Sequence, residues 1–214
     1  MSLPAVRLTD AVAVQQQFPL LSGVTLSLAP GSLTVVTGAN GSGKTSLLRL
    51  LAGVLAPTSG EATVLGVDLS RHRTEVRRRV GWLGHDGSFY QDLSVRENLA
   101  FAATALDRPL SAIAPALERV GLAHRSEVRT KDLSAGQRRR LGLAWLLVRR
   151  AELWLLDEPY ASLDDEGRRF LDDLLADVLA AGATVVLSAH DPLRSAALVP
   201  QTYRLAGGRI VESS

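Results

Sequence analysis

The stretch Gly38-Ala39-Asn40-Gly41-Ser42-Gly43-Lys44-Thr45 fits the Gly-x-x-x-x-Gly-Lys-Ser/Thr pattern of a phosphate-binding loop. Residues 32–37 before it are mostly β-branched, which predicts a buried strand, and residues 45–52 after it are strong helix formers. The alternative, an ordinary glycine turn ahead of a helix, is disfavoured by these flanks.

Strand, glycine loop and helix together predict a nucleotide phosphate site. Glycines allow backbone N–H groups to turn inward around an anion, and the N-terminus of the helix adds partial positive charge. We expect Lys44 to reach the β- and γ-phosphates and the Thr45 hydroxyl to hold Mg²⁺, with Ser46 beside them at the start of the helix.

Composition indicates one globular domain with room for a subdomain, since 46% of the 214 residues are apolar. The net charge of +2 does not favour nucleic acid as a partner. The chain has no cysteine, which excludes disulfides and thiolate metal sites. The longest apolar runs, 141–148 and 178–189, are shorter than the roughly 20 residues of a membrane span, and residues 1–10 lack the apolar core of a signal peptide. We therefore expect no direct membrane insertion, and work at a membrane would require docking to a partner.

Strands should alternate with helices along most of the chain, which predicts a mainly parallel α/β sheet. Residues 93 to about 125 differ, because they are rich in Ala, Leu and capping residues (Asp92 or Ser94, then Ser111) and have no β-branched run. We expect a helical subdomain at residues 86–140, and a nucleotide-binding core from residues 1–85 and 141–214. Expected strands are 5–8, 24–28, 61–67, 79–84, 153–157 and 184–188, with a hairpin at 202–211, an exposed basic helix face at 71–79 and an amphipathic helix at 164–180.

Two carboxylates, Asp157 and Glu158, follow four apolar residues. Side chains at the carboxyl end of a central parallel strand point into the ligand crevice. We expect Asp157 to hold Mg²⁺, directly or through water, and Glu158 to polarise an attacking water. The alternative is that these are two acidic residues at a strand end without a catalytic role. Such pairs are common in isolation, but the phosphate loop in the same chain disfavours this interpretation.

The stretch Leu133-Ser134-Ala135-Gly136-Gln137 resembles the Leu-Ser-Gly-Gly-Gln signature of the ATP-binding subunit of ABC transporters. Four other motifs occur in that family's order and spacing: the phosphate loop and residues 155–159, 161–164 and 188–191. The resemblance implies an ABC ATPase fold of the P-loop NTPase class, with a mainly parallel sheet flanked by helices, an N-terminal antiparallel β part and a helical subdomain that carries the signature.

The resemblance also implies roles for residues outside the phosphate loop. Ser134, Gly136 and Gln137 open a helix and would bind phosphate in the site of a second subunit, which gives a two-fold dimer with two nucleotides at its interface. Asp164 matches the D-loop aspartate, which communicates between the two sites. His190 matches the switch histidine that contacts the γ-phosphate and orients the catalytic glutamate and water; the alternative is a satisfied core histidine.

Two positions depart from the family pattern. His85 stands where the family carries a glutamine that senses Mg²⁺ and meets the transport subunit. Residues 14–17 match the region of the aromatic that stacks on adenine, and Phe18 is displaced from it. Adenine is therefore left without an evident stacking partner.

Smaller features narrow the resemblance to the ATPase subunit of the haem exporter of cytochrome c maturation: residues 20–24, Leu-Gly-His at 83–85, Ala135 and Leu-Trp-Leu-Leu-Asp-Glu-Pro at 153–159. This likeness implies ATP and Mg²⁺ as ligands, integral membrane transport subunits as partners, and a peripheral place on the cytoplasmic face of the cell membrane.

Three alternatives remain open. The first is the ATPase of another small exporter, for lipid, drug or peptide. The second is a soluble ABC ATPase acting on DNA or ribosomes, which usually has coiled-coil insertions, tandem cassettes or basic arms that this sequence lacks. The third, a nucleotide kinase or GTPase, has no need of residues 133–137.

Overall fold

The computed structural model describes residues 3–84, 89–161, 163–190 and 198–213. The chain folds into two compact units, one formed by residues 1–82 and 152–214 and the other by residues 83–151.

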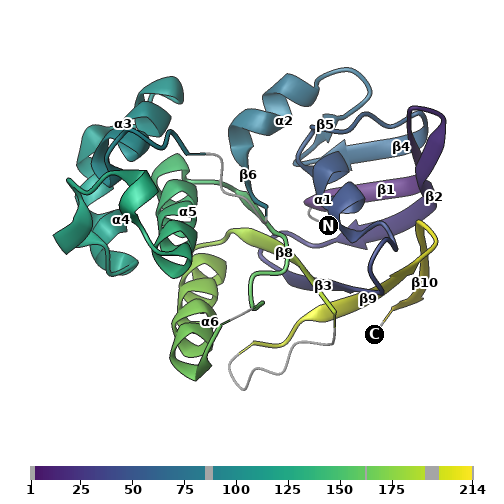
Figure 1. Ribbon diagram of the computed structural model, residues 1–214. Helices are drawn as coiled ribbons and strands as arrows, with labels where there is room; N and C mark the ends of the chain where they lie inside the picture. Colours follow the sequence, from purple (N-terminus) through teal and green to yellow (C-terminus); the bar gives the residue numbers. More distant parts are fainter. Residues whose placement is uncertain (1–2, 85–88, 162, 191–197, 214) are drawn as a thin grey trace. The chain divides into compact units, whose positions relative to one another are not determined.

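The first unit begins with a four-stranded antiparallel sheet in the order β2-β1-β4-β5 (Figure 1). Its strands are β1 (Val6–Gln15), β2 (Phe18–Leu28), β4 (Ser59–Val64) and β5 (Val67–Asp68). The strands expected at 5–8 and 24–28 are parts of the long β1–β2 hairpin. The strand expected at 61–67 is confirmed over 61–64 as part of β4, but its continuation is wrong, because Leu65 and Gly66 both adopt positive φ and turn the chain between β4 and β5.

A six-stranded sheet in the order β10-β9-β3-β8-β7-β6 forms the rest of this unit's β structure. Strand β3 pairs in parallel with both β8 and β9, and β7 pairs in parallel with β8, whereas β9 and β10 form an antiparallel hairpin. The expected parallel sheet and C-terminal hairpin are confirmed. The strands are β3 (Leu33–Thr37), β6 (Val80–Leu83), β7 (Leu153–Leu156), β8 (Thr184–Ala189), β9 (Gln201–Ala206) and β10 (Arg209–Ser213).

Helix α1 (Lys44–Leu51) lies between the two sheets and contacts β2, β7 and β8 (Figure 1). Four of its leucines are fully buried in one core cluster with residues of both sheets: Leu47, Leu48, Leu50 and Leu51. Burying each leucine side chain contributes about 1.5–3 kcal/mol to stability. This burial anchors the helix and the loop at its N-terminus.

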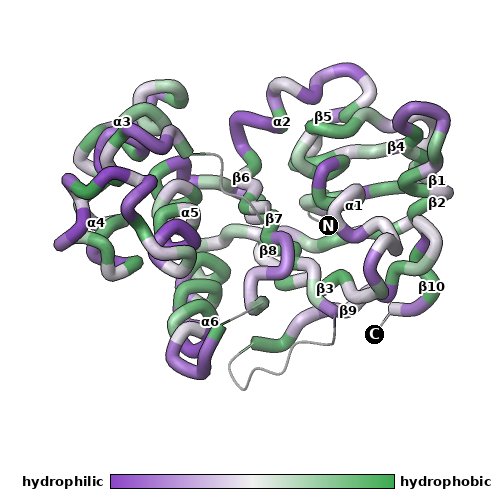
Figure 2. Tube along the Cα trace, viewed as in Figure 1, coloured by the Kyte–Doolittle hydropathy of each residue, from purple (hydrophilic) through white to green (hydrophobic). Residues whose placement is uncertain are grey.

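Two further helices belong to the first unit. Helix α6 (Asp165–Ala180) packs against β8 and ends before Gly182, as expected. Helix α2 (Arg73–Arg79) buries only Val76, and Figure 2 shows it in the hydrophilic colour along most of its length. The basic run is therefore an exposed helix face, as predicted.

In its described residues, the second unit has β structure at the end of β6, at Leu83, and at an isolated bridge between Ser94 and Arg129, and its other regular elements are helices. Helices α3 (Val95–Ala105) and α4 (Ile113–Arg119) both pack against α5 (Ala135–Arg149). Ser94 caps α3 as expected, but Ser111 caps no helix, because it lies within a 3₁₀ turn at Leu110–Ala112. Helix α5 continues to Arg149, beyond the expected boundary at residue 140.

Candidate functional site

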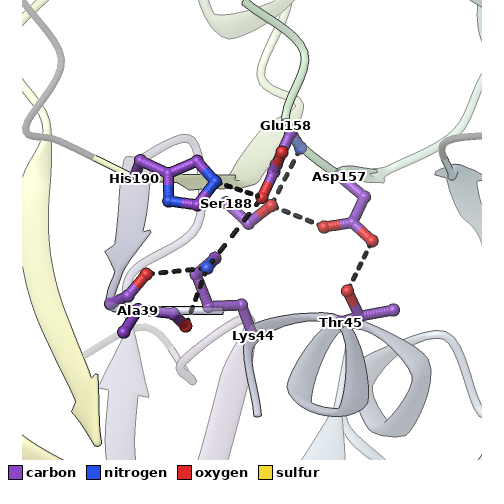
Figure 3. A network of polar contacts seen from close by, with 8 residues as sticks. Ala39, Lys44, Thr45, Asp157, Glu158, Ser188 and His190 are labelled. Carbon is purple, nitrogen blue, oxygen red and sulfur yellow. Dashed lines mark hydrogen bonds and ion pairs between the residues drawn. The ribbon is translucent and has the colours of Figure 1, made fainter. Parts of the chain in front are cut away.

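The segments that follow β3, β8 and β7 converge, because these three strands are neighbours in the parallel sheet. The phosphate loop follows β3, His190 follows β8, and Asp157 and Glu158 follow β7. Figure 3 shows their side chains facing one another at this edge of the sheet. Ligands of parallel α/β sheets bind at such an edge.

The loop at residues 38–45 is shaped to admit an anion. Gly38 has a φ of 148°, and a Cβ there would overlap the carbonyl oxygen of Leu205 and lie 2.7 Å from Ser42 Oγ. Gly43 occupies the N-cap position before α1 and provides no side-chain cap, and the first turn has no acidic residue. In contrast, the side chains of Ser94, Ser134 and Asp164 cap α3, α5 and α6. The first N–H groups of α1 have no partner within the helix, so they are available to bind phosphate oxygens.

Lys44 brings a positive charge to the same loop. Its side chain is only 6% exposed, and Nζ donates to the carbonyl oxygens of Gly38 at 2.7 Å and Ala39 at 3.2 Å. Nζ also lies 3.9 Å from Oε1 of Glu158. The ammonium is thus held between the loop and the carboxylate, where a phosphate chain would meet it.

A chain of hydrogen bonds joins the phosphate loop to the carboxylate of Asp157 and to the backbone of Glu158 (Figure 3). Thr45 Oγ1 donates to Asp157 Oδ2 at 2.7 Å, and Ser188 Oγ donates to Asp157 Oδ1 at 2.6 Å. The backbone N–H of Glu158 donates to Ser188 Oγ at 2.8 Å. Ser188 was not among the expected site residues, although its place in the motif at 188–191 pointed to it.

Glu158 and His190 form a pair beside this chain. His190 Nε2 lies 3.2 Å from Glu158 Oε1, and the two side chains are 51% and 29% exposed. Half-exposure rules out a core histidine at position 190. Glu158 adopts a φ of 49°, a left-handed conformation that L residues with a side chain rarely take. Such strain gathers at functional sites.

A cavity of about 540 Å³ opens beside the loop. The β9–β10 hairpin contributes residues that sequence reasoning did not identify, because no motif marks them and only strand pairing brings β9 beside β3. The lining residues are Thr37, Gly38, Ala39, Asn40, Gly41, Ser42, His190, Arg204, Leu205, Ala206 and Gly207.

The donor set fits Mg²⁺ delivered with a nucleotide. Thr45 and Asp157 supply adjacent oxygen ligands, and within the described residues no group of three or more His, Asp or Glu could hold a metal without other ligands. Mg²⁺ typically takes one or two carboxylates and completes its shell with phosphate oxygens and water. The buried Ser42 Oγ has no hydrogen-bond partner among the described residues, which also fits a site that receives a polar ligand.

The signature residues belong to the second unit and open α5. Ser134 Oγ accepts from the N–H of Gln137 at 3.2 Å, and Gln137 Oε1 accepts from the N–H of Ser134 at 3.0 Å. Ser134, Ala135 and Gly136 are exposed, and no atom lies within 4 Å of a Cβ built on Gly136. This helix end is therefore open to an external ligand.

The remaining expected residues are placed as follows. Asp164 is exposed and caps α6 by accepting from the N–H of Gly167 at 2.8 Å. Ser46 lies partly buried in the first turn of α1. Phe18 opens β2 just beyond the hairpin turn and is 73% exposed. His85 lies outside the described residues.

Comparisons with known proteins agree with these motifs. The sequence model of the ABC transporter family matches residues 21–161. Proteins named "Cytochrome c biogenesis ATP-binding export protein CcmA" are similar along most of their length. The one from Rhodopseudomonas palustris (strain BisB5) is 43% identical over 83% of this chain and 88% of its own, and the one from Pseudomonas fluorescens (strain Pf0-1) is 41% identical over 92% of each.

Solved structures share the fold. A dimeric ATP-binding cassette in a post-hydrolysis state, bound to ADP and Pi, superposes with a TM-score of 0.89 at 22% identity and covers 98% of this chain and 97% of its own. A part of the cbiONQ ABC transporter complex of Clostridium perfringens has a TM-score of 0.86 at 25% identity, over 100% and 89%. The expected fold class is confirmed.

Proposed function

Because the chain belongs to the ABC transporter family, we propose that it is the ATP-binding and ATP-hydrolysing subunit of the exporter that serves cytochrome c maturation, with haem as the linked cargo. The polar network that joins the phosphate loop to Asp157, Glu158 and His190 carries the ATPase assignment. The shared name of the curated relatives supports the process.

The phosphate chain of ATP binds at the uncapped N-terminus of α1. Backbone N–H groups at the N-terminus of α1 and the Lys44 ammonium bind the β- and γ-phosphates, and Thr45 and Asp157 would hold the metal. When bound, Mg²⁺ neutralises charge on the phosphates.

Glu158 is the group that activates water. Its carboxylate lies between Lys44 and His190, and it accepts a proton from the water that attacks the γ-phosphorus. The Nε2–H of His190 donates to Glu158 Oε1 and so holds the carboxylate in one orientation.

We assign Ser134, Gly136, Gln137 and Asp164 to the nucleotide site of a second copy. The open N-terminus of α5 supports this assignment. The capping box engages the N–H groups of Ser134 and Gln137, and it does not block a phosphate from binding the other N–H groups of the first turn. In a two-fold dimer each copy would contribute its signature to the site of the other.

Mixed dimers test this composite site. A Lys44→Ala chain lacks the loop ammonium, and a Ser134→Arg chain places a bulky charge at the signature. Mixing the two should regenerate one intact site out of two and restore nucleotide-dependent dimerisation and part of the hydrolysis that each variant lacks. If no mixture regains either, the sandwich arrangement is wrong.

The partners are proposed to be integral membrane transport subunits that hold this chain at the cytoplasmic face of the cell membrane. No helix in the described part of the chain is long and apolar enough to cross a bilayer. A partner that spans the membrane would therefore provide the path for the cargo.

The process can be tested in a bacterium that lacks its own ATPase subunit of this kind. Expression of the chain should restore covalently bound haem in c-type cytochromes, and the Lys44→Ala variant should not. Intact ATP hydrolysis without any restored haem attachment would contradict the haem assignment and favour an exporter of another cargo.

A further inference from the structure

We propose, on the basis of the ATPase function proposed above, that Ser188 is a positioning residue. Its single hydroxyl orients the carboxylate of Asp157 and at the same time holds the backbone of Glu158 in its left-handed conformation.

The direction of each hydrogen bond is set by the groups involved. A serine hydroxyl has one proton to donate and lone pairs to accept. The backbone N–H of Glu158 can only donate, so the Ser188 proton goes to Asp157 Oδ1, 2.6 Å away, and the oxygen accepts from Glu158 at 2.8 Å. Ser188 is fully buried at the end of β8, so water does not compete for either bond.

The bond to Glu158 acts where the backbone is strained. At a φ of 49° the residue occupies a region that costs about 1–2 kcal/mol for an L side chain. A strained conformation persists only where the surroundings over-determine it. Here Ser188 accepts the N–H of Glu158, and the N–H of Ala161 donates to the carbonyl of Glu158 at 3.1 Å. The backbone direction at Glu158 decides where its carboxylate points.

The bond to Asp157 acts on the metal side. Oδ2 of Asp157 accepts from Thr45, and Oδ1 accepts from Ser188, so the carboxylate plane is fixed by one bond on each oxygen. A charged acceptor also polarises the hydroxyl and strengthens its acceptance from Glu158. One side chain thus links the metal-holding carboxylate to the base.

Residue Thr34 supplies a matched control. It lies fully buried on β3, next to β8 in the sheet, and its Oγ1 has no hydrogen-bond partner among the described residues. Thr34→Val removes a buried hydroxyl from the same sheet without removing a hydrogen bond. If Ser188→Ala loses activity and Thr34→Val does not, the loss cannot be attributed merely to removing a buried hydroxyl from this sheet.

The test compares purified wild type with Ser188→Ala, Ser188→Thr and Thr34→Val. We expect Ser188→Ala to lower kcat about 10- to 100-fold, the usual range for a group that orients a metal ligand, with a smaller change in KM for ATP. Equilibrium titrations with ATP, one set with Mg²⁺ and one with EDTA, measure how much Mg²⁺ raises the affinity for ATP. This gain should also be smaller in Ser188→Ala. Ser188→Thr, which keeps the hydroxyl, should restore most of both, and Thr34→Val should leave both unchanged.

A merely structural role predicts a different pattern. It would lower the thermal unfolding midpoint and the active fraction, but kcat per folded site and the effect of Mg²⁺ on affinity would match wild type, and that result overturns the positioning role. Should Ser188→Ala not fold, Ser188→Cys in reductant decides, since its weaker S–H bonds must lower kcat if the role is correct. Absence of ATP hydrolysis in wild type would instead overturn the proposed function.

Discussion

Replacing Glu158 by glutamine separates binding from chemistry at this site. Glutamine has the same length and keeps the backbone N–H that donates to Ser188, so the geometry of the segment after β7 should persist. The substitution removes the proposed proton acceptor, and it removes one negative charge 3.9 Å from Lys44 Nζ. Phosphate oxygens also bear negative charge, so ATP affinity should stay the same or rise.

The expected loss lies in the chemical step. A positioned general base contributes about 10²- to 10⁴-fold, or roughly 3–5 kcal/mol of barrier. Glu158→Gln should therefore lower kcat by at least about 100-fold, which is the lower limit of that range. The variant should also accumulate as an ATP-bound dimer. Phosphate release measures kcat, nucleotide titration measures affinity, and size-exclusion chromatography with ATP measures the dimer.

Two comparisons make the result decisive. Glu61→Gln makes the same chemical change on an exposed residue of β4 and should leave all three quantities at wild-type values. Asp157→Asn should lose the benefit of Mg²⁺ to ATP binding, which Glu158→Gln should keep. Near-normal turnover of Glu158→Gln would refute the assignment of the base and require another group to activate water.

Two further changes have outcomes that the structure predicts. Gly38→Ala should weaken ATP binding by about 2 kcal/mol or more, because its Cβ meets the Leu205 carbonyl at a φ of 148°, and an unchanged affinity would contradict the tight loop geometry. Burial raises the pKa of the Tyr160 hydroxyl, so the folded state keeps its proton at pH values where the unfolded state has lost it. The free energy of unfolding should therefore fall as the pH rises above about 10, by up to about 1.4 kcal/mol per pH unit. Denaturant titrations of Tyr160→Phe should show a shallower fall over the same pH range, and equal slopes would exclude this origin.

Local patterns predicted the elements that carry their own signals. The phosphate loop was recognisable because glycine, lysine and threonine must stand at set positions between a strand and a helix, and the structure has β3 and α1 there. The hairpin around residues 207–208 was recognisable for a similar reason, since adjacent glycines permit the positive φ of the turn. Errors arose where the signal was weak, as at Leu65, which turns the chain without glycine's freedom, and at Ser111, a capping residue type with no helix to cap.

The sequence by itself determined the fold family and named the candidate reactive groups, because each motif is a short run whose chemistry depends on neighbours in the chain. Only the tertiary structure decided the order β3-β8-β7, which brings the loop, His190 and Glu158 to one edge of a sheet. It also decided the hydrogen bonds of Ser188, which lies 30 positions from Glu158 and 31 positions from Asp157 in the chain. Strand order and long-range hydrogen bonds depend on how the whole core packs, and no local periodicity encodes that packing.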